Sequence, residues 1–169
     1  PGAGGTGYGD FITNFKLSNA NTEMLFYTNY HKLFRTTSAS TVDSTGWTRL
    51  TGVENTVNPA NNTSVSIRAM DFSWGSYIST HAMYFGTNNS KIYRLDDYAN
   101  IDATTIPKAI TPPGLTGNVQ DIAVNPNDDN EIMAVVSIYN TVSIWWQANA
   151  KNITPTWSKA EGNLTIHSH

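Results

Sequence analysis

The chain has 169 residues, of which 39% are hydrophobic and 14% are charged, and its net charge is −3. This apolar content is enough for a folded core, and the low charge argues against a disordered segment. Ten Lys and Arg residues against thirteen Asp and Glu residues leave no basic stripe for nucleic acid. No apolar run approaches the ~20 residues of a membrane helix. The absence of cysteine excludes disulfides, thiolate metal sites and cysteine nucleophiles.

Residues 1–9 contain five glycines, so we predict a loop or linker there. The rest of the chain repeats one pattern three times, over residues 10–63, 64–116 and 117–169, and we expect the last range also to hold the start of a further repeat. Each repeat holds four short apolar segments separated by turns rich in Asn, Gly, Pro or Ser, which is typical of β-strands. The predicted strands centre on residues 15–17, 24–27, 33–35 and 46–48, then 67–70, 82–85, 92–94 and 108–110, then 122–124, 132–135, 144–146 and 156–158. No segment shows the 3.6-residue period of a helix.

A repeat of about 50–60 residues with four strands is typical of a β-propeller blade, because one such sheet cannot bury both faces until neighbours stack on it. We therefore predict an all-β fold, an arc of three four-stranded antiparallel blades. Closed propellers have about four to eight blades, so an arc of three leaves an apolar face bare at each end. We expect the chain to be an excerpt of a larger propeller whose remaining blades lie on the same or another chain. A homo-oligomeric ring is the alternative.

The segment 119–132, followed by Ile144-Trp145 and Pro155-Thr156-Trp157, resembles the sortilin-like and BNR-like propeller repeats, which are of the Asp-box type. The strings at 33–40, 92–95 and 160–165 resemble those of large secreted proteins from bacteria that use the type IX secretion route. The resemblance covers nearly the whole chain after residue 9. It implies a bacterial protein that is secreted or at the cell surface, and it implies no known reaction.

The turn before the fourth strand of the first repeat contains Asp43, Gly46 and Trp47. BNR-like proteins carry an Asp-box of the form Ser-x-Asp-x-Gly-x-Thr-Trp at this place, and the spacing here is altered. We interpret Asp43 as a cap of the turn and Trp47 as a side chain packed between blades. The tripeptide that begins at Asp43 also resembles the O-glycan acceptor of the same bacterial group, which makes Ser44 a glycosylation candidate. The alternative is a plain turn serine.

In a propeller the turns between second and third strands project on one face of the disc. Here these turns carry Tyr30, His31, Asn88, Asn89, Tyr139 and Asn140. Aromatic rings and amides suit contacts with a protein or a glycan, so this face is a candidate ligand surface. The alternative is ordinary hairpin chemistry. Trp74 and Tyr77 lie in a loop expected on the opposite face, where an exposed Trp74 would favour binding of a partner.

Catalysis by a propeller glycosidase needs two facing carboxylates, and sialidases also need an arginine cluster. Neither arrangement is evident in the sequence, and Arg35 and Arg94 occupy equivalent repeat positions, which indicates a structural role. The histidines His31 and His81 lack metal-ligand spacing. We therefore predict a non-catalytic scaffold or recognition module with no cofactor and no metal. The alternative is a fragment of a sialidase-like or xyloglucanase-like glycoside hydrolase whose catalytic residues lie mostly outside this segment.

Overall fold

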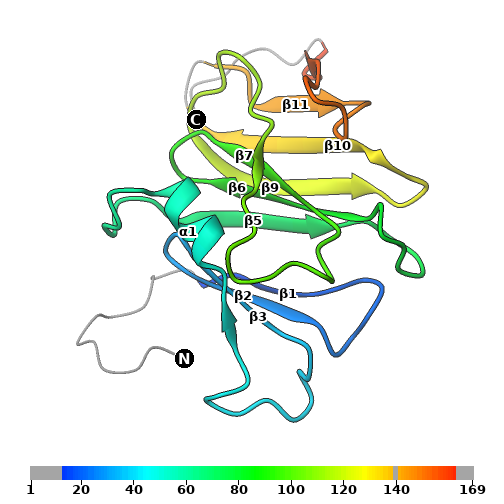
Figure 1. Ribbon diagram of the computed structural model, residues 1–169. Helices are drawn as coiled ribbons and strands as arrows, with labels where there is room; N and C mark the ends of the chain where they lie inside the picture. The colour runs from blue at the N-terminus through cyan, green and yellow to red at the C-terminus, as the bar shows by residue number, and fades with distance from the viewer. Residues whose placement is uncertain (1–12, 139–140, 163–169) are drawn as a thin grey trace.

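The computed structural model describes residues 13–138 and 141–162. Within them the chain forms three four-stranded antiparallel sheets and one short helix. The sheets lie one above another in Figure 1, with the first in blue below, the second in green in the middle and the third in yellow to orange on top. The predicted all-β fold with three four-stranded sheets is therefore confirmed.

Each sheet is built from strands that are consecutive in the sequence and pair in sequence order. The first sheet consists of β1 (Phe15–Leu17), β2 (Leu25–Asn29), β3 (Lys32–Thr36) and β4 (Thr48–Arg49). The second consists of β5 (Ile67–Phe72), β6 (Ala82–Thr87), β7 (Ile92–Asp96) and β8 (Lys108–Ala109). The third consists of β9 (Asn118–Asn125), β10 (Asp128–Ser137), β11 (Ile144–Gln147) and β12 (Trp157–Lys159). Every strand overlaps a predicted one, but β9 and β10 extend into the predicted turn and leave only residues 126–127 between them.

The strand pairing places corresponding residues of the three sheets at the same register. Arg35 of β3 pairs with Phe26 of β2, and Arg94 of β7 pairs with Tyr84 of β6. The corresponding pair in the third sheet is Trp146 with Met133. The sequence repeat therefore corresponds to a repeat of strand pairing. In the third sheet a tryptophan occupies the position that an arginine occupies in the first and second sheets.

Two hydrophobic clusters hold the sheets together. One joins the first sheet to the second, and its rings include Phe26 and Phe72 with centroids 5.3 Å apart. The other joins the second sheet to the third through residues such as Tyr84, Ile122 and Trp145. The second sheet is thus covered on both faces, and every residue of β6 is buried. Alternation along a strand sends neighbouring side chains to opposite faces, so β6 contributes to both clusters.

Strands β6 and β9 approach each other at Gly86. A Cβ atom built on Gly86 would lie 2.6 Å from the Cβ of Val119, closer than real side chains allow. Glycine is therefore required at this point, because any side chain would push the second and third sheets apart.

The helix α1 (Thr51–Val57) was not predicted, and the expectation of no helix is wrong here. Seven residues are too few to show a helical period, and the N-cap residue Leu50 makes no side-chain capping bond. Tertiary contacts stabilise the helix instead, since Val53 and Val57 are buried in the first cluster and short helices depend on such packing. Gly52 lets the helix lie directly against the main chain of Thr104 and Thr105.

Candidate functional site

His31, a predicted ligand residue, lies at the β2–β3 turn but is only 2% exposed. Its Nε2 atom is 3.1 Å from Asn61 Oδ1 and 3.7 Å from Glu54 Oε1, and its Nδ1 atom is 3.4 Å from Asn58 Nδ2. These contacts fit a neutral ring that donates from Nε2 and accepts at Nδ1. They join the hairpin to α1 and the segment after it, and they favour a structural role for His31.

The other described residues of the predicted ligand surface differ in their exposure and in the hydrogen bonds that they make within the protein. The main-chain carbonyl of Tyr30 accepts a hydrogen bond from the amide of Ile67 at 2.9 Å. The Asn88 side chain accepts from the Ser66 amide and donates to the Ser64 carbonyl. Asn89 is exposed, and its Oδ1 accepts from the Thr87 hydroxyl at 2.5 Å.

Tyr139 and Asn140, the third pair of that surface, lie outside the described residues. The structure therefore brings Tyr30 beside the start of the second sheet, encloses His31 against α1 and the segment after it, and leaves Asn89 facing solvent. Ligand binding by this surface stays a prediction.

The turn at Asp43 has the capping geometry that was predicted. Asp43 Oδ1 accepts hydrogen bonds from the amide and hydroxyl of Thr45, at 2.8 and 2.7 Å, and from the amide of Gly46 at 3.1 Å. The side-chain and main-chain bonds from Thr45 lower the pKa of Asp43. Ser44 is exposed at the tip of this turn, and its glycosylation stays a prediction.

Trp47 lies on the outer side of the first sheet. Its ring contacts Tyr27 with centroids 5.9 Å apart, and Tyr27 in turn contacts Phe34. The corresponding tryptophan of the third sheet, Trp157, packs on the second cluster and donates from Nε1 to the Ile110 carbonyl of the second sheet. Trp157 therefore packs between sheets, whereas Trp47 packs on its own sheet.

Arg35 and Arg94 make equivalent contacts with the following sheet. The Nη1 atom of Arg35 donates to the carbonyls of Tyr98 and Ala99, at 3.4 and 3.0 Å. The Nη1 atom of Arg94 donates to the carbonyls of Ala150 and Asn152. In both cases an arginine on the third strand of one sheet reaches the loop after the third strand of the next. These contacts favour the predicted structural role of both arginines.

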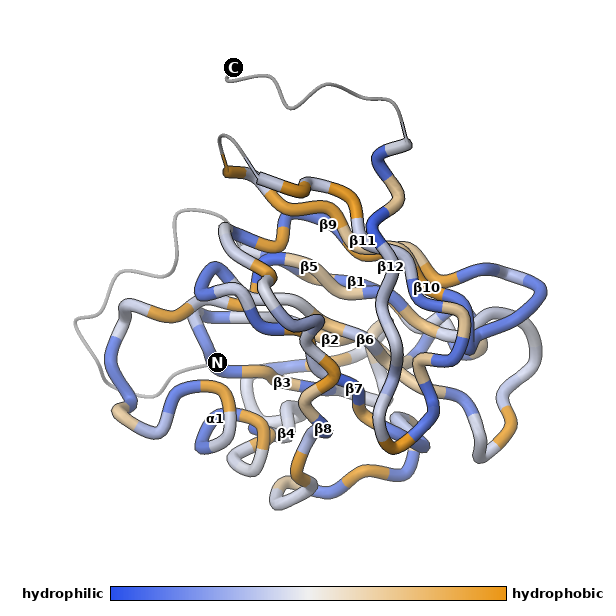
Figure 2. The backbone as a smooth tube through the Cα atoms, turned by 90° about the horizontal axis from the view of Figure 1, so that it is seen from above, coloured by the Kyte–Doolittle hydropathy of each residue, from blue (hydrophilic) through white to orange (hydrophobic). Residues whose placement is uncertain are grey.

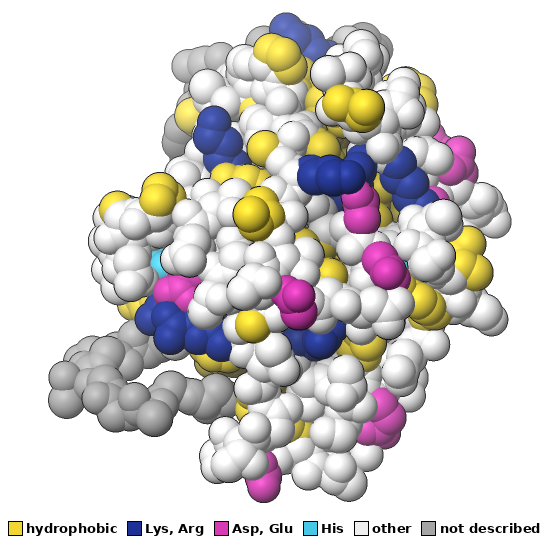
Figure 3. All heavy atoms as spheres, viewed as in Figure 1, with side chains coloured by type: hydrophobic (Ala, Val, Ile, Leu, Met, Phe, Trp, Pro, Cys, Tyr) yellow, Lys and Arg dark blue, Asp and Glu magenta, His cyan; other side chains and the backbone are white. Residues whose placement is uncertain are grey.

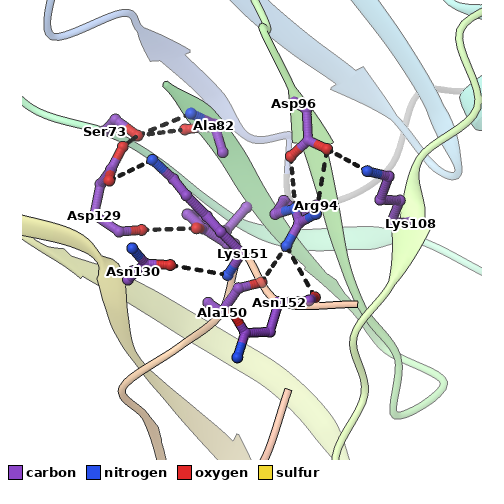
Figure 4. Close-up of polar contacts among 11 residues, drawn as sticks. Ser73, Ala82, Arg94, Asp96, Lys108, Asp129, Asn130, Ala150, Lys151 and Asn152 are labelled. Carbon is purple, nitrogen blue, oxygen red and sulfur yellow. Dashed lines mark hydrogen bonds and ion pairs between the residues drawn. The ribbon is translucent and has the colours of Figure 1, made fainter. Parts of the chain in front are cut away.

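A polar cluster surrounds Arg94 between the second and third sheets (Figure 4). Asp96 lies between Arg94 and Lys108, with Arg94 Nε 2.6 Å from Asp96 Oδ1 and Lys108 Nζ 2.6 Å from Asp96 Oδ2. Burial alone would raise the pKa of Asp96, but the hydrogen bonds and positive charges of Lys108 and Arg94 outweigh it and lower the pKa.

A second part of this cluster centres on Asp129. Its carboxylate accepts from the Ser73 hydroxyl and pairs with Lys151, while its carbonyl accepts from the Tyr84 hydroxyl at 2.7 Å (Figure 4). Burial and then the charge of Asp129 raise the pKa of Tyr84, which stays protonated. Ser73 is fully buried and also bonds both main-chain groups of Ala82. This hydroxyl is therefore enclosed by the structure and does not face a substrate.

Asp71 connects the first strands of the three sheets. Its Oδ1 lies 2.6 Å from Lys16 Nζ on β1, and its Oδ2 accepts from the Val124 amide on β9 at 2.8 Å. The sequence does not predict this link or the Asp129 cluster, because the partners of Asp71 lie 53 and 55 residues away and those of Asp129 lie 22 to 56 residues away. The only sequence signal was an acidic residue inside an apolar strand.

Both buried acidic residues of the described chain, Asp71 and Glu54, are paired with a cation, and so are the partly exposed Asp96 and Asp129. Asp71 pairs with Lys16, Asp96 with Arg94 and Lys108, Asp129 with Lys151, and Glu54 with Arg49. Within the described part of the chain, no group of three His, Asp or Glu side chains is placed to hold a metal ion. A shallow hollow of about 240 Å³ lies beside α1 and is lined mainly by Thr and Asn side chains with Gly52 and Ile106.

The loop between β5 and β6 exposes an apolar patch. Trp74 is 47% exposed and Ile78 is 56% exposed. Tyr77 in the same loop instead packs against Tyr98, with ring centroids 5.6 Å apart. The exposure of Trp74 is the condition under which we expected this loop to favour a partner.

Charges of both signs are mixed on the face of the molecule that Figure 3 shows. On the face of Figure 3, Lys and Arg side chains lie beside Asp and Glu, without a broad patch of one sign. Hydrophilic and hydrophobic residues alternate along the tube of Figure 2, and the one described helix is too short to cross a membrane.

A scan of protein-family models found no match for this chain, and a search of curated proteins found no relative.

Proposed function

We propose that this chain is a non-catalytic segment of a larger β-propeller and serves as a scaffold or recognition module. One observation carries the proposal. The second sheet is covered on both sides, but the first and third sheets each turn one apolar face away from it. The outward positions of the first sheet include Phe15, 71% exposed, and Leu17, 45% exposed. The outward positions of the third include Met133, 43% exposed, and Val135, 36% exposed.

The corresponding positions of the middle sheet indicate what these faces would contact. In β6 the residues on both faces are buried by a neighbouring sheet. In β2 and β10 only alternate residues are buried, although the apolar composition is similar. Extended apolar patches on a soluble protein generally mark an interaction site. Further sheets stacked on both faces would continue the packing already present.

The resemblance to secreted bacterial propeller repeats supports a location outside the cell, at the surface or released. The exposed Trp74 and Ile78 support contact with a protein or glycan partner, since aromatic and apolar surface is what such contacts bury. The pairing of the interior carboxylates with cations supports scaffold rather than glycosidase, because hydrolysis needs one acid and one base free to face a sugar.

The test is the behaviour of the purified chain in solution. We expect the 18.5 kDa chain either to associate with increasing concentration in analytical ultracentrifugation or to bind the dye ANS at its open sheet faces. Replacing Leu17 and Met133 by Lys should reduce both signals. The matched control is Ile153→Lys, because Ile153 is 99% exposed and lies in the loop between β11 and β12 and not on a strand. A stable monomer that binds no ANS would contradict the proposal.

A further inference from the structure

The loops after the third strands of the three sheets contain the same turn. In each turn a main-chain amide donates a hydrogen bond to the carbonyl three residues earlier, with the nitrogen and oxygen 2.9–3.0 Å apart. The donor and acceptor pairs are Thr41 and Ser38, Asn100 and Asp97, and Asn152 and Asn149. These positions correspond under the strand register, because each turn begins three residues after Arg35, Arg94 or Trp146. The three turns are therefore one repeated element.

Two of these turns accept an arginine from the preceding sheet. The turn of the second sheet binds Arg35, and the turn of the third sheet binds Arg94. Arg94 is only 3% exposed, and the pKa of Arg35 is lowered by its burial. Guanidinium groups held in this way are fixed in position, since a buried cation needs acceptors for its N–H groups.

The turn of the first sheet offers the same pair of acceptors. The carbonyls of Ala39 and Ser40 correspond to those of Tyr98 and Ala99, which bind Arg35. Among residues 13–138 and 141–162, no N–H or O–H group donates to the Ala39 or Ser40 carbonyl. Glu23 of the same sheet fixes the conformation of this turn. The Ala39 amide donates a hydrogen bond to the Glu23 carbonyl, and the Ser40 amide and hydroxyl donate to the Glu23 carboxylate.

The sheet face beside this turn is apolar and aromatic. Phe15 pairs with Tyr27, and Tyr27 pairs with Phe34, so the three side chains form a row across the sheet. Trp47 extends the row. Trp157, its counterpart in the third sheet, donates its indole N–H to a carbonyl of the preceding sheet. The first sheet therefore has the apolar row, the tryptophan and the carbonyl pair that the third sheet uses against the second.

We infer that the outer face of the first sheet is a docking site for another four-stranded sheet of the same kind, whose third strand carries an arginine that binds the carbonyls of Ala39 and Ser40. This inference rests on the proposed function and adds the chemistry of the occupant. The third sheet of a second copy does not supply that chemistry. Trp146 stands at the arginine position, and its indole N–H already donates to Glu131 at 2.7 Å.

The chain itself can be converted into the missing partner by Trp146→Arg. The variant places an arginine on the outer face of its third sheet, so one copy should dock on the first sheet of another in a head-to-tail contact. A hydrogen bond to a charged donor adds about a tenfold gain in affinity or more. We expect self-association at least about tenfold tighter than wild type, by sedimentation equilibrium. Trp146→Met, which removes the indole without adding the cation, should give no gain.

A second change identifies the surface that receives the arginine. Adding Phe15→Glu to Trp146→Arg should return association to the wild-type level, because a carboxylate would then lie in the apolar row. Circular dichroism checks that each variant is folded, and Glu131→Ala with Trp146→Arg excludes capture of the new arginine by Glu131.

Three results would overturn the inference. Folded Trp146→Arg chains, with or without Glu131, could associate no better than wild type. The gain could survive Phe15→Glu. The wild-type chain could already form closed oligomers that Trp146→Arg leaves unchanged, which would assign the face to a second copy. None of these results by itself contradicts the proposed function. That function requires the sheet faces either to bind ANS or to be covered by another copy of the chain, so it fails only if the wild-type chain is a stable monomer that binds no ANS.

Discussion

Lys16 and Asp71 form an ion pair between the first strands of the first and second sheets, with Nζ and Oδ1 2.6 Å apart. The other oxygen of Asp71 accepts the Val124 amide on the first strand of the third sheet. Because Asp71 is only 5% exposed, one carboxylate joins three sheets from inside the protein. The contact shows that the first strands of the three sheets lie close together.

Replacing Asp71 by Ala should destabilise the protein by about 2–4 kcal/mol, because the Val124 amide would remain buried without an acceptor. Urea unfolding followed by tryptophan fluorescence measures this loss. Lys16→Met is the comparison variant and should cost less than Asp71→Ala, because Asp71 keeps the hydrogen bond from the Val124 amide and the lost cation is 39% exposed. Equal losses in the two variants would mean that the bond to Val124 adds nothing.

Arg94→Met should be more destabilising than Arg35→Met, although the two arginines occupy the same repeat position. Arg94 is almost completely buried, and its removal leaves the carbonyl of Ala150 without its donor and Asp96 without one of its two cations. Arg35 is partly exposed and has no acidic partner at ion-pair distance in the described chain. We expect losses of about 2–4 and about 1–2 kcal/mol, respectively, measured by urea unfolding at pH 7. The reverse order would contradict this account of the interface.

The stability of the protein should fall in acid. Burial alone would raise the pKa of Glu54, but hydrogen bonding and the charge of Arg49 outweigh it, so the pKa lies below its ordinary value of 4.5. Asp96 likewise has a pKa below its ordinary 3.8. A carboxyl group with a lower pKa in the folded state binds fewer protons there. Its contribution is complete above the unfolded pKa and is lost as the pH falls through the folded pKa.

The unfolding free energy from these groups should therefore be level from pH 7 to about pH 5 and decline below that. Urea titrations at a series of pH values measure the profile. Glu54→Gln and Asp96→Asn should be less stable than wild type at pH 7 and should lose less on acidification, because each lacks one of the groups that titrate. A wild-type profile that stays level down to about pH 3 would mean that the pairs with Arg49, Arg94 and Lys108 do not favour the charged carboxylates.

The strands and their order could be predicted from the sequence because their signals are local. Alternating or continuous apolar runs such as that of β6, bounded by turn residues, indicate strands without knowledge of the fold. The equivalent positions of Arg35 and Arg94 could also be read from the repeat. Their partners could not, because carbonyl acceptors in a loop leave no trace in side-chain identity.

The helix α1 and the burial of His31 depend on contacts between distant segments. The helix is fixed by packing and by Gly52 against the loop at Thr104, and His31 is enclosed by residues that follow that helix. Nothing near His31 in sequence distinguishes it from an exposed hairpin histidine. The predicted ligand surface therefore rests on turn position alone. Turn position indicates the side of the sheet on which a residue lies but does not indicate how exposed its side chain is.

Gly86→Ala should destabilise the contact between β6 and β9 because the added methyl group would overlap the side chain of Val119. Overpacking of this kind costs about 1–3 kcal/mol, measured by urea unfolding. Val119→Gly alone should also destabilise, because it removes a buried side chain. Glycine is used because an alanine would keep the Cβ atom that lies 2.6 Å from the added methyl group. The double variant separates two effects of Gly86→Ala. Steric overlap destabilises the folded protein, whereas the loss of backbone freedom in the unfolded chain would by itself stabilise the folded protein. If overlap is the cause, the double variant should be more stable than the sum of the single losses predicts, by about 0.5 kcal/mol or more. Additive losses would mean that the two sheets do not meet as closely at Gly86 as this geometry requires.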